Sequence, residues 1–177
     1  MKGSFVTVFG FVGRSGCGKT TLICKLIRYF SSNGLRVGAF KHAHKGFQLD
    51  YPGKDSYSLK EAGASAVCLL SGNQSAMIFD YGCPQEMIFQ QLVKFLNTLG
   101  CDILFIEGLK KESHFPKLCF VERVEESELS LKEVVSCVGL ITQTKESKDF
   151  WENKPVFFRD DVSAISSFIL HWINPSL

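Results

Sequence analysis

From Gly13 to Thr20 the chain reads GRSGCGKT, which matches the pattern G-x-x-x-x-G-K-[ST] at every fixed position. The preceding stretch, Phe5–Val12, is almost wholly apolar and β-prone, and Thr21–Phe30 carries apolar residues at helical spacing. The pattern therefore stands between a predicted buried strand and a predicted amphipathic helix. This context favours a phosphate-binding loop over a glycine-rich turn that matches by chance.

The residue types of this loop suit a polyphosphate ligand. Its glycines let the backbone turn several amides inward toward one anion. The helix beginning near Lys19 adds free N–H groups and the positive end of its dipole. We expect the Lys19 ammonium to reach the β- and γ-phosphates and the Thr20 hydroxyl to bind Mg²⁺.

Composition points to one soluble α/β domain covering residues 1–177. Hydrophobic residues make up 45%, enough for a sizeable core, and the net charge of +2 does not indicate a nucleic-acid binder. No apolar run approaches the length of a membrane span. Met1–Ser4 runs directly into the first predicted strand, which leaves no room for a signal sequence.

The chain has seven scattered cysteines and no C-x-x-C pattern. We expect reduced thiols in a cytoplasmic protein, mostly as small core residues, and a zinc site is disfavoured. Cys17, within the glycine-rich loop, is read as a small residue rather than a nucleophile.

A second informative stretch is Asp102–Gly108, in which four apolar residues are followed by Glu107. It resembles a Walker B strand, whose terminal carboxylate would lie near the Mg²⁺ held by Thr20. Glu107 would then bind the metal through water or orient an attacking water. The alternative is an ordinary buried strand that ends in an acid.

The remaining elements follow from apolar periodicity and turn residues. A polar loop is expected over 41–56, a charged exposed segment over 124–132, and a last helix begins at Asp160-Asp161. Either Asp55 or Ser56 caps the short helix at 55–62, or the pair Lys54-Asp55 has a role in the cleft. Further strands are predicted at 35–41, 66–70, 75–79, 118–121, 134–141 and 155–158, and helices at 55–62, 84–99 and 162–173. This order predicts an α/β fold of the P-loop NTPase type: a doubly wound, mostly parallel sheet with an antiparallel hairpin insertion.

Several blocks occur in the order and spacing of the MobB family, and the resemblance runs from about Phe5 to Ile173. Besides the glycine-rich loop they are Lys41-His42-x-His44, Asp50-x-Pro52-Gly53-Lys54-Asp55-Ser56, Ala62-Gly63-Ala64, Glu107-Gly108-Leu109-Lys110 and Asp160-Asp161-Val162. The resemblance implies a homodimeric GTP-binding protein of molybdenum cofactor biosynthesis. Such a protein assists MobA, the guanylyltransferase that converts the molybdopterin cofactor to its guanine dinucleotide form, and hydrolyses GTP slowly.

The resemblance also implies roles for individual residues. Lys19 and Glu107 would be the catalytic pair, and Thr20, Asp50 and Glu107 would lie on the metal side. His42, Lys54 and Asp55 would line the cleft, for the pterin or the partner rather than for GTP. The residues expected to bind the nucleotide or line its cleft are Gly13, Ser15, Gly16, Cys17, Gly18, Lys19, Thr20, Thr21, His42, Lys54 and Asp55.

The chain departs from the family pattern in two places. Gly46 stands where many relatives have an acid, and Lys45 replaces a second histidine. The segment Thr144-Lys145-Glu146-Ser147 looks like Thr-Lys-x-Asp without its acid, so that Gln143 is left as a weaker acceptor for guanine. The preference for GTP over ATP therefore rests on the resemblance.

Other interpretations stay open. Lys41 and Lys45 flank His42 and His44, which disfavours a metal site and favours an anion- or partner-contacting loop. A small P-loop kinase that phosphorylates a metabolite with ATP is the alternative function. It would need an arginine-rich lid, whereas Arg159 and most other arginines are predicted to lie apart from the phosphates. A purely structural protein does not account for the intact loop.

Overall fold

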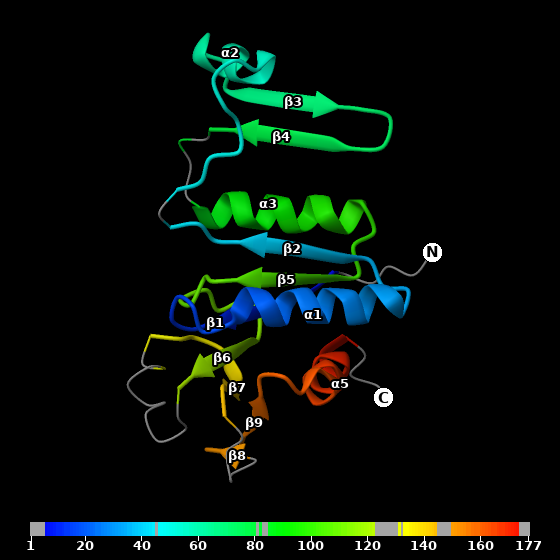
Figure 1. Ribbon diagram of the computed structural model, residues 1–177, viewed down its shortest axis with the longest axis vertical. Helices are drawn as coiled ribbons and strands as arrows, with labels where there is room; N and C mark the ends of the chain where they lie inside the picture. Colours follow the sequence, from blue (N-terminus) through cyan, green and yellow to red (C-terminus); the bar gives the residue numbers. More distant parts are fainter. Residues whose placement is uncertain are drawn as a thin grey trace. The chain divides into compact units, whose positions relative to one another are not determined.

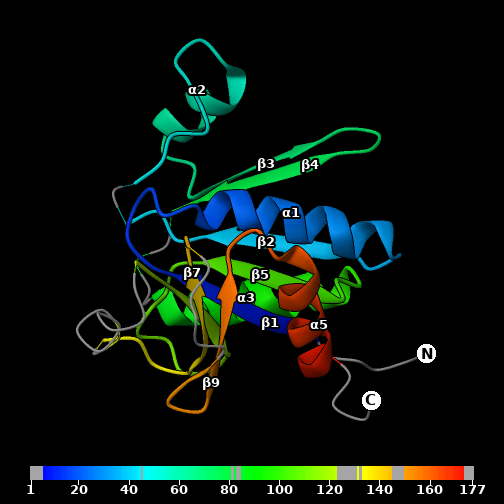
Figure 2. The same cartoon turned by 60° about the horizontal axis from the view of Figure 1, so that its bottom comes forward.

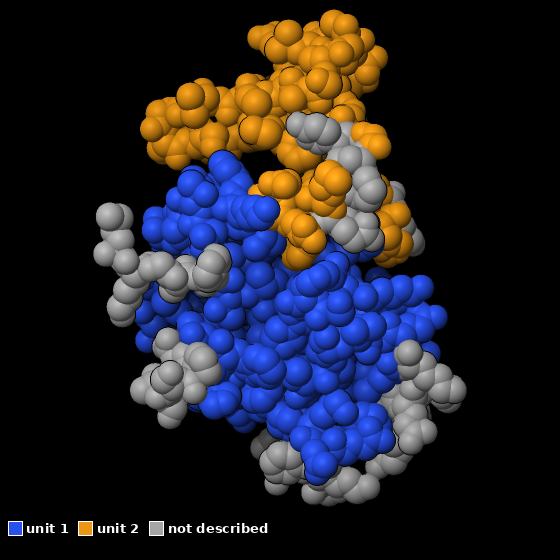
Figure 3. Space-filling model, turned by 180° about the vertical axis from the view of Figure 1, so that it is seen from behind, with its two compact units in different colours: residues 1–42, 92–177 blue, residues 43–91 orange. Residues whose placement is uncertain are grey.

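The computed structural model describes residues 6–44, 46–80, 82, 85–122, 131, 133–144 and 150–173. The chain divides into two compact units, which Figure 3 colours separately. The first unit comprises residues 1–42 and 92–177, and the second comprises residues 43–91.

The first unit contains a sheet in the order β2-β5-β1-β6-β7-β9-β8 (Figure 1). Neighbouring strands are parallel except for β8, which pairs antiparallel with β9. Parallel pairing places the carboxyl ends of the strands at one edge, where ligands bind in such folds. The bounds are β2 Val37–Lys41, β5 Ile103–Glu107, β1 Thr7–Val12, β6 Lys117–Val121, β7 Cys137–Thr142, β9 Lys154–Phe158 and β8 Phe150–Trp151.

Helices cover both faces of this sheet. On one face, α1 (Lys19–Ser32) and α5 (Val162–Ile173) lie beside each other (Figure 2) and bury side chains against β1 and β5. On the other face, Leu96 near the end of α3 (Gln85–Thr98) lies close to Gly38 of β2. The predicted doubly wound, mostly parallel sheet is therefore confirmed.

An aromatic cluster anchors the strand and helix that flank the glycine-rich loop. The Phe105 ring lies 5.6 Å from Phe11 of β1 and 5.6 Å from Phe30 of α1, measured between ring centroids. All three side chains are fully buried. Truncation of one such phenylalanine costs about 3–5 kcal/mol, so the two ends of the loop are held firmly.

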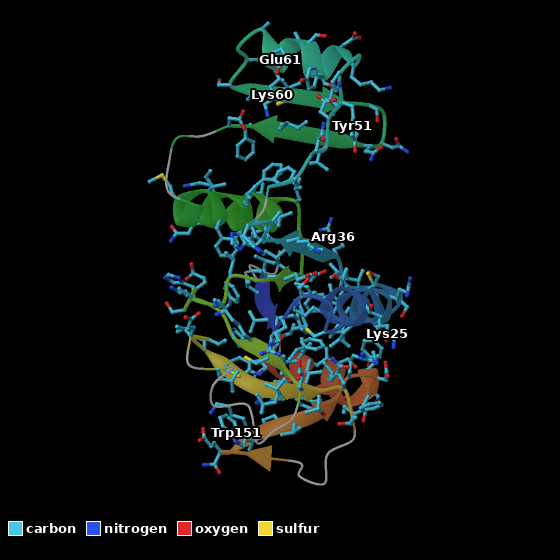
Figure 4. All side chains as sticks on the ribbon, turned by 60° about the vertical axis from the view of Figure 1, so that its left-hand side comes forward. Lys25, Arg36, Tyr51, Lys60, Glu61 and Trp151 are labelled. Carbon is cyan, nitrogen blue, oxygen red and sulfur yellow. The ribbon has the colours of Figure 1, made fainter. Side chains whose placement is uncertain are left out.

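The second unit contains α2 (Asp55–Glu61) and the antiparallel pair β3 (Ala66–Leu70) and β4 (Ser75–Phe79). Ser71 N–H donates to the Gln74 carbonyl at 2.8 Å, which closes the predicted hairpin turn. Lys60 of α2, labelled in Figure 4, forms an ion pair of 3.2 Å with Asp80. The predicted hairpin insertion over 66–79 is confirmed.

Several element boundaries differ from the predictions. β7 begins at Cys137 rather than at Val134, because Val134 N–H closes a turn onto the Leu131 carbonyl and Ser136 has a φ of 60°. β2 begins two residues later than predicted, and the two-residue strand β8 was not predicted. Pro84 and nearly all of the charged segment 124–132 lie outside the described residues.

Of the two predicted helix N-caps, the one on α2 is wrong and the one on α5 is confirmed. The extended residue before α2 is Lys54 and no side chain caps that helix, so the prediction that Asp55 or Ser56 caps it is wrong. Asp161 does cap α5, because its Oδ1 accepts a hydrogen bond of 3.0 Å from Ala164 N–H. Over the described part of the chain, no helix is both long and apolar enough to cross a membrane.

Candidate functional site

The glycine-rich loop joins the end of β1 to the start of α1, as predicted. Gly18 caps α1 in the left-handed conformation, with a φ of 94°. Gly13 has a φ of 152°, and a Cβ on it would meet Phe120 Cβ at 2.6 Å. Both positions therefore require glycine. Gly18 requires it for its backbone angle, and Gly13 requires it both for its backbone angle and because β6 approaches closely.

The Lys19 ammonium is folded back over this loop. It donates hydrogen bonds to the carbonyls of Gly13 at 3.0 Å and Arg14 at 2.5 Å, and it lies 3.5 Å from the Cys17 sulfur. The Lys19 side chain thus lies over the loop backbone. Cys17 is half-buried and packs against the core, in agreement with its reading as a small residue.

Thr20 and Glu107 meet at the carboxyl edge of the sheet. The Thr20 hydroxyl donates to Glu107 Oε2 at 2.6 Å, and the Lys41 ammonium lies 3.3 Å from Glu107 Oε1. Strand register explains the meeting, because Glu107 stands beside Phe11 of β1 on one side and Lys41 of β2 on the other. The Glu107 side chain is only 16% exposed, so its charge is held at a partly desolvated position.

This pair fits Mg²⁺ chemically. Mg²⁺ prefers hard oxygen ligands and is commonly held by few protein groups together with phosphates and water. The Thr20 hydroxyl and the Glu107 carboxylate supply two such oxygens at the mouth of the loop. Within the described residues, no cluster of three or more His, Cys, Asp or Glu side chains is present.

The turn after Glu107 brings His42 to the same edge. His42 N–H donates to the Glu107 carbonyl at 3.0 Å, and Gly108 N–H donates to the Phe11 carbonyl at 3.0 Å. Gly108 has a φ of 108°, and a Cβ on it would lie 3.0 Å from His42 Cβ. The structure therefore places His42 beside Glu107, and its predicted role in lining the cleft stays a prediction.

Asp50, Lys54 and Asp55 belong to the second unit, so their roles at the loop stay predictions. Asp50 Oδ1 accepts a hydrogen bond of 3.0 Å from Tyr51 N–H. Its Oδ2 is shielded from solvent and has no hydrogen-bond partner among the described residues. Asp55 is the first residue of α2.

Ser15 and Thr21 are two further predicted site residues of the first unit, and neither makes a described contact that would define its role. Ser15 lies exposed in the loop, and Thr21 lies exposed in the first turn of α1. Gln143 is exposed directly after β7, where the Thr142 hydroxyl donates to the Thr144 carbonyl at 2.8 Å. Residues 145–147, which complete the possible base-reading segment, lie outside the described residues.

Arg159 was not among the predicted site residues, and the prediction that it lies apart from the loop is wrong. A Cβ placed on Gly18 would meet Arg159 Cδ at 3.0 Å and Nη1 at 3.4 Å. Arg159 is the first residue after β9, a parallel strand whose carboxyl end shares the edge of the glycine-rich loop. That position after the last predicted parallel strand was the signal that could have identified it.

The fold and the site together match a known family. The family model described as "Molybdopterin guanine dinucleotide synthesis protein B" (MobB) matches residues 8–143. The chain belongs to the MobB family. This MobB-family chain is 30% identical over 175 residues to the molybdopterin-guanine dinucleotide biosynthesis adapter protein of Escherichia coli (strain K12), covering 97% of this chain and 95% of that protein.

Two Bacillus subtilis comparisons agree. The probable adapter protein of strain 168 is 30% identical over 161 residues, which cover 90% of this MobB-family chain and 88% of that protein. The crystal structure of Bacillus subtilis MobB has a TM-score of 0.76 at 26% identity, and the match covers 94% of this chain and 97% of that chain. The resemblance to MobB and the predicted fold class are thus confirmed.

Proposed function

We propose that this MobB-family protein binds GTP with Mg²⁺ at the glycine-rich loop and acts as an accessory protein in molybdenum cofactor biosynthesis. There it would assist conversion of the molybdopterin cofactor to the guanine dinucleotide form, with weak GTP hydrolysis at most. The observation that carries the nucleotide proposal is the hydrogen bond between Thr20 and Glu107, next to the Lys19 ammonium over its loop. Relatives named as adapter proteins of this pathway support the biological role.

Different residues of the chain would bind the phosphates and the Mg²⁺. The loop amides and the N-terminus of α1 would bind the phosphates, and Lys19 would exchange its carbonyl partners for phosphate oxygens. Thr20 and Glu107 would hold Mg²⁺, which supplies positive charge against the phosphates. Both Glu107 oxygens are already engaged, one by Thr20 and one by Lys41. A Glu107 carboxylate that binds Mg²⁺ and pairs with Lys41 would be a poor general base, which supports the proposal of weak hydrolysis at most.

Partners are proposed from chemistry and from the family. The second unit exposes several large apolar side chains, and its two-stranded sheet has open edges that suit pairing with another chain. We assign this surface to a second copy, giving a homodimer, and we propose a MobA-like guanylyltransferase and the molybdopterin cofactor as further partners. The exposed apolar residues described in this unit are Phe47, Leu49, Tyr51, Leu59, Leu69, Leu70, Met77 and Met87.

The remaining expectations stand as proposals as well. We propose that both units act as one nucleotide-binding domain, to which Asp50, Lys54 and Asp55 contribute. A cytoplasmic location is supported by the free thiols of all six cysteines that the structure describes.

A small P-loop kinase that uses ATP is the second candidate. It is favoured by one feature: the first residues after β7, Gln143 and Thr144, include no acid that could accept hydrogen bonds from guanine. An ATP-dependent enzyme would not need such an acid.

Calorimetric titration with GTP and with ATP, each with Mg²⁺, tests these proposals. The proteins compared are the wild type, Lys19→Ala and the matched control Lys111→Ala, which removes an exposed lysine outside the loop. Preferential GTP binding that only Lys19→Ala abolishes supports the proposal. Preferential ATP binding contradicts the guanine assignment and moves the kinase to first place, with acceptor screening as the next step.

A further inference from the structure

We propose that Arg159 covers the nucleoside end of the bound nucleotide and stacks its guanidinium plane on the purine ring. The inference rests on the proposed nucleotide site and adds a residue that positions the base. It is carried by the packing of Arg159 on Gly18, by the order of the strands and by the anchoring of the Arg159 turn.

Arg159 lies directly against the loop. The three atoms nearest to the position of a Cβ on Gly18 are Arg159 Cδ, Nη1 and Nε, at 3.0, 3.4 and 3.8 Å. Gly18 is the residue immediately before Lys19 and the cap of α1. The guanidinium therefore lies beside the backbone that would bind phosphate, and about one-third of the Arg159 side chain is exposed to solvent.

The order of the strands indicates on which side of β1 the nucleoside end of a bound nucleotide would lie. Thr20 and Glu107 mark the metal side, and Glu107 ends β5, which adjoins β1. Arg159 follows β9, which lies on the other side of β1 beyond β6 and β7. Since Mg²⁺ is held between the outer phosphates of a nucleoside triphosphate, the nucleoside extends away from Glu107 and toward the side from which Arg159 reaches the loop.

The turn that carries Arg159 is fixed along α1. Arg159 N–H donates to the Thr142 carbonyl at 2.9 Å, and Asp160 Oδ1 accepts from the Lys25 ammonium at 2.7 Å. Figure 4 labels Lys25 on α1. Lys25 holds the pKa of the Asp160 carboxyl below its usual range. The backbone of the turn that carries Arg159 is thus fixed before a ligand arrives, which lowers the entropic cost of binding.

The charge and shape of Arg159 indicate what it contacts. A cation beside the N-terminus of α1 is disfavoured by the helix dipole, and its neighbour Asp160, at 3.6 Å, is shared with Lys25. An anionic nucleotide would offset this excess of positive charge. A guanidinium is also planar and weakly hydrated, so it stacks well on aromatic rings, whereas an ammonium does not.

Isothermal titration with GTP, GDP and inorganic tripolyphosphate tests the inference. The proteins compared are the wild type, Arg159→Ala, Arg159→Lys and the control Arg28→Ala, which removes an exposed arginine further along α1. Loss of one stacking contact should weaken GTP and GDP binding by about tenfold in both Arg159 variants. Tripolyphosphate has no ring, so its binding should be unchanged in Arg159→Lys, which keeps the charge, and should weaken much less than GTP binding in Arg159→Ala. Arg28→Ala should bind like the wild type.

Other outcomes overturn the inference. An equal loss of tripolyphosphate binding, or full rescue by Arg159→Lys, would mean that Arg159 contacts phosphate instead. Unchanged GTP binding in Arg159→Ala would remove the residue from the site. Because Arg159→Lys keeps the aliphatic stem over Gly18, it reports on binding even if Arg159→Ala folds poorly. A wild type that binds tripolyphosphate but no nucleotide contradicts the inference, and one that binds neither contradicts the proposed function itself.

Discussion

The Thr20 hydroxyl donates a hydrogen bond of 2.6 Å to Glu107 Oε2, although 87 positions separate the two residues in the chain. If this pair holds Mg²⁺, Thr20→Ala should reduce the gain in GTP affinity that Mg²⁺ provides. This Mg²⁺-dependent gain should fall about tenfold, since a contact to a charged group contributes about 1.5 kcal/mol. Titration with GTP in Mg²⁺ and in a chelator measures the gain.

Thr20→Ser is the matched control for this experiment because it keeps the hydroxyl. It should preserve most of the Mg²⁺-dependent gain, and Glu107→Gln should lose it as Thr20→Ala does. Equal Mg²⁺ dependence in the wild type, Thr20→Ala and Glu107→Gln would contradict the assignment of the metal site.

Gly18→Ala should destabilise the protein. A side chain at a φ of 94° costs about 1–3 kcal/mol, and the new Cβ would also lie 3.0 Å from Arg159 Cδ. Gly16→Ala is the matched control, because Gly16 also has a positive φ, of 79°, but no atom of the described residues other than its chain neighbours lies within 4 Å of its Cβ position. Chemical denaturation should show a larger loss of unfolding free energy for Gly18→Ala.

A double variant isolates the contribution of Arg159. In an Arg159→Ala background, Gly18→Ala and Gly16→Ala should lose more nearly equal amounts of unfolding free energy. The reason is that the Arg159 atoms that crowd the new Cβ at position 18 are no longer present. An unchanged difference would show that the backbone angle alone accounts for the loss.

Lys117→Met should be strongly destabilising. The Lys117 side chain is fully buried, and its ammonium donates to the Glu112 carbonyl and to the Val135 carbonyl, the latter at 2.9 Å. Its Nζ also lies 4.3 Å from the centroid of the Phe115 ring. Methionine fills the space but leaves buried carbonyls without a donor, at a cost of about 1–3 kcal/mol each. Urea unfolding measures the loss.

The exposed Lys111 provides the control for this substitution. Lys111→Met should change the unfolding free energy by less than about 0.5 kcal/mol. Comparable stabilities of Lys117→Met and Lys111→Met would mean that the buried ammonium adds nothing over an apolar side chain of similar length.

Glu112 should contribute stability that disappears in acid. A hydrogen bond from the His114 ring is the largest cause that lowers the pKa of the Glu112 carboxyl below its ordinary value of 4.5, and the backbone N–H groups of Ser113 and His114 add to it. The contribution is present above the unfolded-state pKa and is lost as the pH falls through the lower folded-state pKa. The stability difference between wild type and Glu112→Gln should therefore shrink below pH 4.5.

Urea denaturation of both proteins at a series of pH values checks this expectation. His114→Ala should lose part of the same unfolding free energy at neutral pH, because it removes the hydrogen bond that contributes most to lowering the pKa of Glu112. A difference between wild type and Glu112→Gln that stays constant down to acid pH would contradict the role given to Glu112.

The elements near the glycine-rich loop were predictable because their signals are local. The apolar run before Gly13 and the helical spacing after Thr20 reflect burial on adjacent elements, and a left-handed residue such as Gly18 is recognisable by type. Boundaries were less predictable where long-range contacts decide them. The start of β7 is one case, because Val135 N–H is bonded to the Lys110 carbonyl and not to a strand.

The glycine-rich loop, the alternation of strands and helices, and the family could all be predicted from the sequence, since each depends on residue types at short spacing. Which distant side chains meet follows from the tertiary structure alone. Thr20 reaches Glu107 because β1 and β5 pair in register. Arg159 reaches Gly18 because β9 ends at the same edge, and its turn is tied to α1 by Asp160 and Lys25. Such meetings depend on strand order and register, which no local pattern encodes.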